Sequence, residues 1–525
     1  MKIDFLLLLG VMLLIHTLHS SEANASQVSF SNSCSVEVKD EINRGITLLH
    51  SFEYPETTQI FGEIISQEPS CALAYWGAAM SIWHPLWAPP SKQNLIAGAI
   101  LLGKTDGLSA TKREKDYIVA LKVFFSSSDV STNRARAVGY SKAMSAIYEK
   151  YRDTDLDATV FYALSLLGSA DPRDKTYGNQ YKSGALLKFA QQTQPDHPGI
   201  LHYIIHSYDF PGLAHLALED AKVYAQAAPD SSHAQHMPSH IFTRLGYWDL
   251  SLASNHDSTS SAATYTKDAH LDGHYDEGLH SMDYLLYAML QTGRDTEALI
   301  LIDEMREIGK TNTENFKVAF AYAASWARYT LERKAWEEAS EIELVRSDDF
   351  PWGEFPWAES IHYFARGIGA ARNGNISQAN MELVHIRQLY KSLPENSPLY
   401  FRVEVDVQAD IVASWILLKN DDVEQALKLA LKAAENEDAV DKHPVTPGEV
   451  IPARELYADM LLEVKNYPEA LKQYQAVLKH SPKRLNALLG AATSAEKSGD
   501  EKLAIGYRAI LRKQTSSGSR KISML

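Results

Sequence analysis

Apolar residues recur every three or four positions through most of the chain from residue 38 onward, which is the spacing of one face of an α-helix. Strict alternation of apolar and polar residues, which would indicate β-strands, is scarce. Short helical segments are separated by turn sequences such as NYPE, SGDE and TGRD. The pattern therefore predicts an all-α protein built from many short helices.

The helical segments repeat, and the repeat is clearest near the C-terminus. The run NYPEALKQYQAVLKHSP places Ala470, Tyr474, Val477 and Pro482 at the offsets of the tetratricopeptide pattern. Elsewhere a glycine that can end one helix precedes, by five positions, a small residue that lets the next helix pack closely. These pairs are Gly212 and Ala217, Gly246 and Ser251, Gly293 and Ala298, Gly374 and Ala379, and Gly499 and Ala504.

These repeats resemble the tetratricopeptide repeat (TPR) family over about residues 38–518. The resemblance implies helix-turn-helix units stacked into a right-handed superhelical solenoid, with the first helix of each unit lining a concave groove. Segments such as ITLLHSFEYPETTQIF and CALAYWGAAMSIWHPLW also resemble a group of exported bacterial TPR proteins of no established activity. We divide the chain into an N-terminal segment 26–37, a first array 38–345, a second array 346–518 and a tail 519–525.

Four stretches interrupt the repeats, and long interruptions of a compact array are often functional. They are 85–94, 170–181, 346–357 and 443–452. We expect such loops to lie over the groove, where they could close over a small substrate or frame a peptide.

Residues 1–25 have the features of a secretory signal peptide. Lys2 precedes an apolar run from Phe5 to Ile15, and Ala23-Asn24-Ala25 supplies the small residues of a cleavage site. The run is too short to span a bilayer, and no later stretch is long and apolar enough to do so. We therefore expect an exported protein, periplasmic or secreted.

Removal of the signal peptide takes away Lys2, Asp4 and Glu22, so the formal net charge changes from −15 to −14. A chain this acidic repels phosphate groups, which argues against nucleic acid and anionic membranes as partners.

The chain has two cysteines, Cys34 and Cys71. In an exported protein they suggest one disulfide, worth roughly 4 kcal/mol of stability in the chain-entropy model, with two buried free thiols as the alternative. Neither lies near the histidines, so thiolate metal ligation and cysteine catalysis are not expected.

Histidines crowd between residues 197 and 280, where 11 of the 19 histidines fall within 84 positions. His202 and His206 are four apart, as are His236 and His240, and the second pair follows the first by 34 residues. A spacing of four is one helical face, and 34 is the length of a TPR unit. The glycine register places both pairs at the groove-facing fifth and ninth positions of adjacent units.

In the third unit the fifth position is Asp283, with His280 one turn earlier. The predicted metal ligands are therefore His202, His206, His236, His240, His280 and Asp283. Imidazole and carboxylate without sulfur suit copper, zinc, iron or manganese, with copper favoured by affinity.

Other residues near this face have weaker claims. Asp209, Glu277 and Tyr208 are candidates for an outer shell or for acid and base work. Pro238 could begin or kink the helix and turn His236 away from the groove. Six other histidines have weaker claims. We interpret two of them as a weaker second wall of the groove, namely His50 and His84. We interpret the other four as helix-terminal or solvated residues, namely His197, His215, His233 and His256.

Two functions fit the sequence, which contains no phosphate-binding loop, nucleophile elbow or His-Glu-x-x-His helix. The first is an exported metal-binding protein, which could be a metal-dependent enzyme. The second is a scaffold without catalytic activity whose groove binds a protein or peptide partner, with histidines that make binding pH-sensitive.

Overall fold

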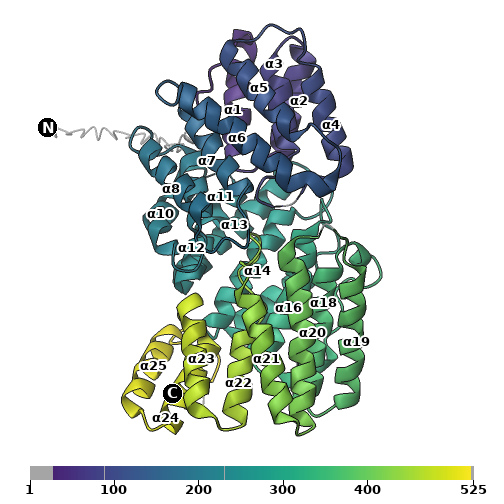
Figure 1. Ribbon diagram of the computed structural model, residues 1–525, viewed down its shortest axis with the longest axis vertical. Coiled ribbons are helices and arrows are strands. Elements are labelled where there is room, and N and C mark those ends of the chain that lie inside the picture. Colours follow the sequence, from purple (N-terminus) through teal and green to yellow (C-terminus); the bar gives the residue numbers. More distant parts are fainter. Residues whose placement is uncertain (1–27, 88, 230, 396, 522–525) are drawn as a thin grey trace, which may run out of the picture.

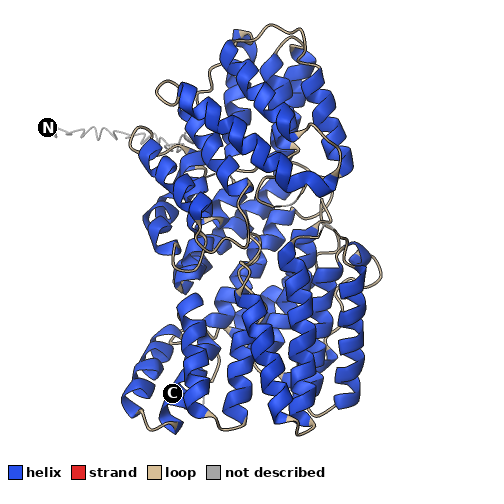
Figure 2. Cartoon of the chain, viewed as in Figure 1, coloured by secondary structure: helices blue, strands red, loops and turns tan. Residues whose placement is uncertain are grey.

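The structure is a computed structural model that describes residues 28–87, 89–229, 231–395 and 397–521. Within these ranges the secondary structure is helical, apart from one isolated β-bridge between His274 and Thr311 (Figure 2). The all-α prediction is confirmed. The predicted signal peptide, residues 1–25, lies outside the described residues.

The helices of the N-terminal half occupy the upper part of Figure 1, and α13 and α14 lie between the two halves. The first half contains α1 (Lys39–His50), α2 (Tyr54–Gln67), α3 (Ala72–Ser81), α4 (Lys92–Gly103), α5 (Lys112–Phe124), α6 (Asn133–Tyr151), α7 (Leu156–Gly168), α8 (Gly178–Gln191), α9 (Pro198–Tyr208), α10 (Leu218–Ala227), α11 (Ser232–His236), α12 (Pro238–Leu245) and α13 (Trp248–Asp268), with short 3-10 helices at Val36–Val38, Val130–Thr132 and Ala214–Ala217.

The second half contains the remaining helices, and those labelled α16 and α18 to α25 lie in the lower part of Figure 1. The helices of this half are α14 (Asp276–Gln291), α15 (Asp295–Arg306), α16 (Phe316–Glu332), α17 (Trp336–Glu341), α18 (Pro356–Arg372), α19 (Ile376–Ser392), α20 (Leu399–Lys419), α21 (Val423–Asp438), α22 (Ala453–Glu463), α23 (Tyr467–His480), α24 (Leu485–Lys497) and α25 (Glu501–Gln514), with a 3-10 helix at Trp352–Glu354.

Stacked helix hairpins account for this order. Consecutive helices pack against each other, and alternate helices such as α16, α18 and α20 also touch, which is the contact pattern of TPR-type repeats. The predicted glycine turns are present, because Gly246, Gly293, Gly374 and Gly499 all have positive φ between +65° and +86°.

Inner and outer helices differ as their sequences require. All 11 residues of α9 are buried, and α14 and α16 are buried on nearly every side, so these apolar helices form the inner layer. Outer helices bury one stripe. In α23 that stripe consists of Ala470, Gln473, Tyr474 and Val477, three of which are positions of the repeat pattern.

Two apolar cores hold the array together. One is built from residues between Val28 and Phe242, and the other from residues between Leu279 and Ala491. Helices α14 to α17, which the sequence analysis grouped with the first array, therefore share their core with the second. The predicted disulfide between Cys34 and Cys71 is present in the first core.

The second half closes on itself. The backbone N–H of Leu485, at the start of α24, donates to Gln291 at the end of α14 at 2.8 Å. Buried Arg484 pairs with Glu332 of α16 at 2.7 Å and with Glu455 of α22 at 2.6 Å. The concave side is thus filled by its own side chains over this half. Among the described residues, no helix is long and apolar enough to cross a membrane.

Candidate metal centre

Helix α9 carries the first histidine pair. His197 caps the helix by accepting hydrogen bonds from the N–H groups of Gly199 and Ile200. His202 donates from Nδ1 to the carbonyl oxygen of His50 at 2.7 Å, which leaves its Nε2 as a lone pair. That Nε2 lies 3.1 Å from Nε2 of His206, one turn further along the helix.

Helices α11 and α12 carry the second pair. Pro238 divides the segment into these two short helices, but the chain continues in helical conformation through Met237, so His236 and His240 still face each other. Their Nε2 atoms are 3.0 Å apart. The sequence analysis left open that Pro238 turns His236 away, and the structure shows that it does not.

Both Nδ1 atoms of this second pair are committed elsewhere. Nδ1 of His236 lies 2.7 Å from Oδ1 of Asn255, whose amide is oriented by its own donation to the carbonyl oxygen of Ser251. Nδ1 of His240 lies 2.9 Å from the carboxylate of Asp209. These acceptors require a proton on each Nδ1, so both Nε2 atoms are lone pairs that point at one another.

Two further histidines complete two triads. His233, on α11, joins His202 and His206, and His280, on α14, joins His236 and His240. In each triad the ligand atoms lie within 4.8 Å of one another, and all six side chains are buried. Nδ1 of His233 donates to Glu277 at 3.2 Å, while its Nε2 is buried without a hydrogen-bond partner. We call this set of six residues the histidine centre.

The triads lie side by side. The ring centroids of His206 and His240 are 6.1 Å apart, and those of His233 and His236 are 6.3 Å apart. Nitrogen–metal bonds of 2.0–2.1 Å place two ligands of one ion roughly 2.9–3.4 Å apart for angles between square-planar and tetrahedral. The Nε2 separations of 3.0 and 3.1 Å fall in that range.

Burial favours the neutral form of five of these imidazoles. It is the main cause that lowers the pKa of His202, His206, His236 and His280 well below the usual value, and neighbouring histidines add to the effect. The pKa of His240 is lowered to about 4, again mainly by burial, even though Asp209 acts to raise it. Neutral imidazole is the form that binds a metal ion.

Two carboxylates support the centre from outside. Asp209 bonds His240 and is itself held by Arg244 at 2.9 Å and by buried Lys442 at 3.0 Å. Glu277 bonds His233 and is held by Lys317, which also pairs with Asp276 at 2.8 Å.

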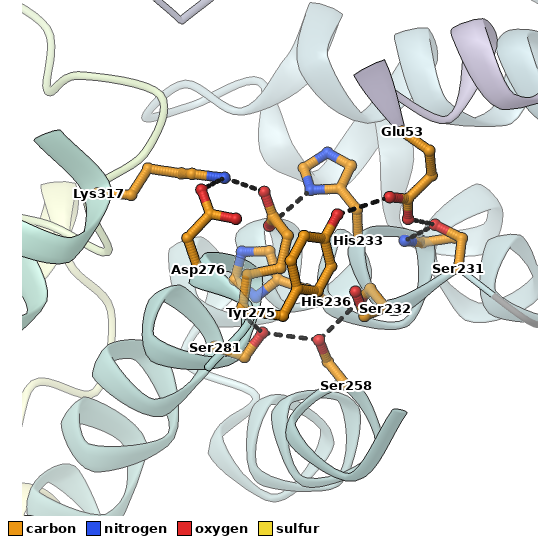
Figure 3. Close-up of polar contacts among 12 residues, drawn as sticks. Glu53, Ser231, Ser232, His233, His236, Ser258, Tyr275, Asp276, Ser281 and Lys317 are labelled. Carbon is orange, nitrogen blue, oxygen red and sulfur yellow. Dashed lines mark hydrogen bonds and ion pairs between the residues drawn. The ribbon is translucent and has the colours of Figure 1, made fainter. Parts of the chain in front are cut away.

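Figure 3 shows the surroundings of His233, with Lys317 and Asp276 on one side and Glu53 on the other. Glu53 accepts from the hydroxyls of Ser231 at 2.6 Å and Tyr275 at 2.8 Å, which ties α11 to its neighbours. The outer layer thus fixes the orientation of the imidazole rings.

Asp283 belongs to neither triad. Its carboxylate pairs with Arg328 of α16, and both side chains are buried. Burial raises the pKa of Asp283 to about 6 despite that partner. Of the other candidates, Asp209 and Glu277 lie in the outer layer, whereas Tyr208 packs against Gly184, away from the triads.

Sequence reasoning missed His233, which it interpreted as helix-terminal or solvated. The signal was available, because His233 stands three positions before His236 and so shares one helical turn with it. It also missed Tyr284, whose ring centroid lies 4.6 Å from that of His236 and whose hydroxyl donates to the carbonyl oxygen of Thr446.

A third cluster joins His50, Asp157 and His197. Nε2 of His50 lies 3.0 Å and Nε2 of His197 lies 3.4 Å from the same oxygen of Asp157. Their Nδ1 atoms are used as well, by Tyr203 for His50 and by backbone N–H groups for His197. Burial acts to raise the pKa of Asp157, but the two histidines overcome it and lower the pKa. Three of the four ring nitrogens are hydrogen-bonded, whereas Nε2 of His197 has only the 3.4 Å contact with Asp157 and no hydrogen-bond partner among the described residues. With most of its ring nitrogens engaged, this cluster fits a structural clamp between α1, α7 and α9.

A cavity of about 690 Å³ reaches the histidine centre at His206. Three of the four predicted interruptions contribute to its walls, through Trp87, Ala170 and His443 among others, whereas the fourth, 346–357, does not. Three of the four loops therefore lie next to the histidines, as expected. The histidines themselves are buried beside this cavity and do not line an open groove.

No family model matches this chain, and no curated protein matches it. Solved structures with a similar helix order include the human IFIT1 dimer with m7Gppp-AAAA, at 10% identity, 92% coverage of this chain, 95% coverage of that chain and a TM-score of 0.36. Another is the P58(IPK) TPR domain, at 12% identity, 89% and 99% coverage and a TM-score of 0.21. Likenesses this distant do not extend to the site, which rests on the residues of this chain.

Proposed function

We propose that this protein binds transition-metal ions in the histidine centre, with one ion in each triad. The observation that carries the proposal is the opposed pair His236 and His240. Two lone pairs 3.0 Å apart in a buried site repel each other. A cation between them turns that repulsion into two coordinate bonds.

The hydrogen bonds around the triads support the same reading. Metal-bound histidines usually donate their second ring N–H to a carboxylate or carbonyl oxygen, which fixes the tautomer and the ring orientation. Four of the six histidines here donate from Nδ1 to such an oxygen, namely His202, His233, His236 and His240. On this proposal, Nε2 of His233 is a metal ligand, which explains why it is buried without a hydrogen-bond partner.

The donor set favours particular metals. Six imidazoles without sulfur suit copper or zinc, and the order of affinities places copper first. Iron and manganese more often take a carboxylate ligand, which is supplied here only from the outer layer.

Three protein ligands leave a coordination position open on each ion, as in catalytic rather than closed structural sites. The cavity at His206 gives the open position at the first triad a route to solvent. We therefore infer a metal-dependent enzyme that acts on a small molecule. An exported location fits the disulfide, since such bonds persist in oxidising compartments.

The peptide-binding scaffold is the weaker candidate. It requires the histidines to meet a partner on an open concave face, whereas His202, His236 and His240 are at most 2% exposed. A partner could still bind elsewhere on the array, but the histidines would not control that binding.

Elemental analysis tests the proposal. Protein purified without chelator should contain about two equivalents of copper or zinc per chain. His233→Ala and His280→Ala, which each remove one ligand from a different triad, should each retain about one. His256→Ala is the matched control, because its side chain in the same part of the chain is 75% exposed. Trace metal in the wild-type protein, or equal loss in the control, would refute the proposal.

A further inference from the structure

We propose that the cavity at His206 is a binding chamber for a neutral, flat, mostly apolar molecule that carries one hydroxyl. The inference rests on the proposed metal centre, because the hydroxyl is placed against an ion held by His206. A phenol is the simplest molecule of this class.

The size and origin of the cavity indicate a built site. Its volume of about 690 Å³ lies within the range of about 300–1,000 Å³ that is typical of small-molecule sites. Its walls come from loops around Trp87, Ala170 and His443 that a plain repeat array does not need. His443 joins two of these loops, since its Nε2 donates to the carbonyl oxygen of Trp87 at 2.8 Å.

Flat or rigid apolar side chains form a large part of the wall. Trp83 and Trp87 contribute indole faces, and Phe210 and Tyr400 contribute two more rings. Trp83 is held in place by stacking on Phe124 with ring centroids 3.7 Å apart. Prolines at several other wall positions add stiffness. Such walls favour a planar ligand that needs little rearrangement to bind.

The charges in the wall neutralise one another. Lys442 pairs with Asp209 at 3.0 Å, and Asp441 pairs with Lys175 at 2.8 Å. At the partly exposed rim, Arg134 pairs with Asp171 at 3.1 Å, and the exposed Arg173 also interacts with that carboxylate, so the wall holds three cations and three carboxylates. A cationic ligand would find no unpaired carboxylate in these pairs and would be repelled by the metal ion proposed for the histidine centre, so a neutral ligand is favoured over a cationic one.

The polar end of the cavity faces the histidine centre. His206 is 6% exposed, more than any of the other five histidines, and Asp209 and Lys442 lie beside it in the wall. The ring of such a ligand would lie between the aromatic side chains of the wall, so that apolar surfaces contact each other. Its hydroxyl oxygen would point toward His206 and the proposed metal ion.

The test uses metal-loaded protein and three probes that each carry one benzene ring: p-cresol, toluene and the phenyltrimethylammonium ion. Binding is followed by calorimetry and by the fluorescence of the wall tryptophans. p-Cresol should bind, whereas toluene, which has no oxygen for the ion, and phenyltrimethylammonium, which is cationic, should each bind at least tenfold more weakly. Failure of p-cresol to bind, or equal binding of all three probes, would overturn the proposal.

Two tryptophan substitutions locate the binding. Ala170→Trp fills the cavity from a loop and should weaken p-cresol binding at least tenfold with unchanged metal content and melting temperature. Ala269→Trp, at the exposed end of α13 and outside the cavity wall, should leave binding unchanged. Equal binding to both variants would mean that the cavity serves only as a path for ions and solvent.

Metal content separates the two proposals. Metal-loaded protein that ignores p-cresol refutes the chamber alone. Protein that takes up no metal refutes the proposed function, and the chamber falls with it, because the hydroxyl would then have no ion to reach.

Discussion

Replacement of Asn255 tests how the outer layer controls the metal site. This residue lies on α13, is fully buried and accepts the Nδ1 proton of His236 at 2.7 Å. Asn255→Leu keeps a similar volume but removes the acceptor. His236 is then free to rotate or to change tautomer, so its Nε2 is no longer held toward the second triad.

The size of the effect follows from two contributions. Loss of an outer-shell partner typically weakens metal binding 10- to 100-fold, which is about 1.4–2.7 kcal/mol. The Nδ1–H group left buried without an acceptor costs a further 1–3 kcal/mol or so in the stability of the metal-free protein. The first triad does not contact Asn255, so its affinity should not change.

A zinc titration of metal-free protein against a competing chelator measures both sites. One of the two binding steps should weaken 10- to 100-fold in Asn255→Leu, and Asn255→Asp, which keeps an acceptor, should recover most of the loss. Ser258→Ala is the matched control, because Ser258 is buried on the same helix and bonds Ser232 and Ser281 instead of a histidine. Unchanged binding in a folded Asn255→Leu variant would refute the reasoning.

Three further predictions concern charge, pH and the disulfide. The Asp283→Asn variant should keep its full metal content, because Asp283 pairs with Arg328 and not with a metal ion. Its unfolding free energy should fall by about 3–5 kcal/mol, since the buried Arg328 is left without a counter-charge. Loss of one metal equivalent would show that Asp283 is a ligand after all. Burial lowers the pKa of His443 to about 4 in the folded chain. Between about pH 6.5 and pH 4 this histidine is therefore protonated in the unfolded chain and neutral in the folded chain. The unfolding free energy consequently falls as the pH drops through that range. Between pH 7.5 and 4.5 the unfolding free energy should fall by about 2.5 kcal/mol less in His443→Gln than in the wild-type protein, and an identical pH dependence would contradict the assignment. Replacing Cys34 and Cys71 together by serine should lower the unfolding free energy by roughly 4 kcal/mol, whereas a change below 1 kcal/mol would show that the chain-entropy estimate fails here.

The sequence carried the local features of the fold well. Helical periodicity, the glycine turns and the disulfide were all predicted. The first two depend on residue types at fixed short spacings, whereas the disulfide prediction rested on two cysteines in a chain expected to be exported. The histidine pairs of α9 and of α11–α12 were also brought together as their 34-residue register indicates, with Nε2 atoms 3.1 and 3.0 Å apart.

The remainder depended on contacts between distant segments, which spacing does not encode. Asp283 occupies a position that the repeat register assigns to the groove, but its carboxylate forms an ion pair with Arg328 on the next inner helix. Burial of the histidines also escaped prediction, because it depends partly on the loop that carries Lys442 and His443, which reaches Asp209 and Trp87 from the other half of the chain.

Anomalous diffraction at the absorption edge of the bound metal tests the central claim most directly. A crystal of protein purified without chelator should give two anomalous peaks, one among His202, His206 and His233 and one among His236, His240 and His280. No peak at either triad in a crystal soaked with copper or zinc, or a peak that lies at Asp283 instead, would contradict the account.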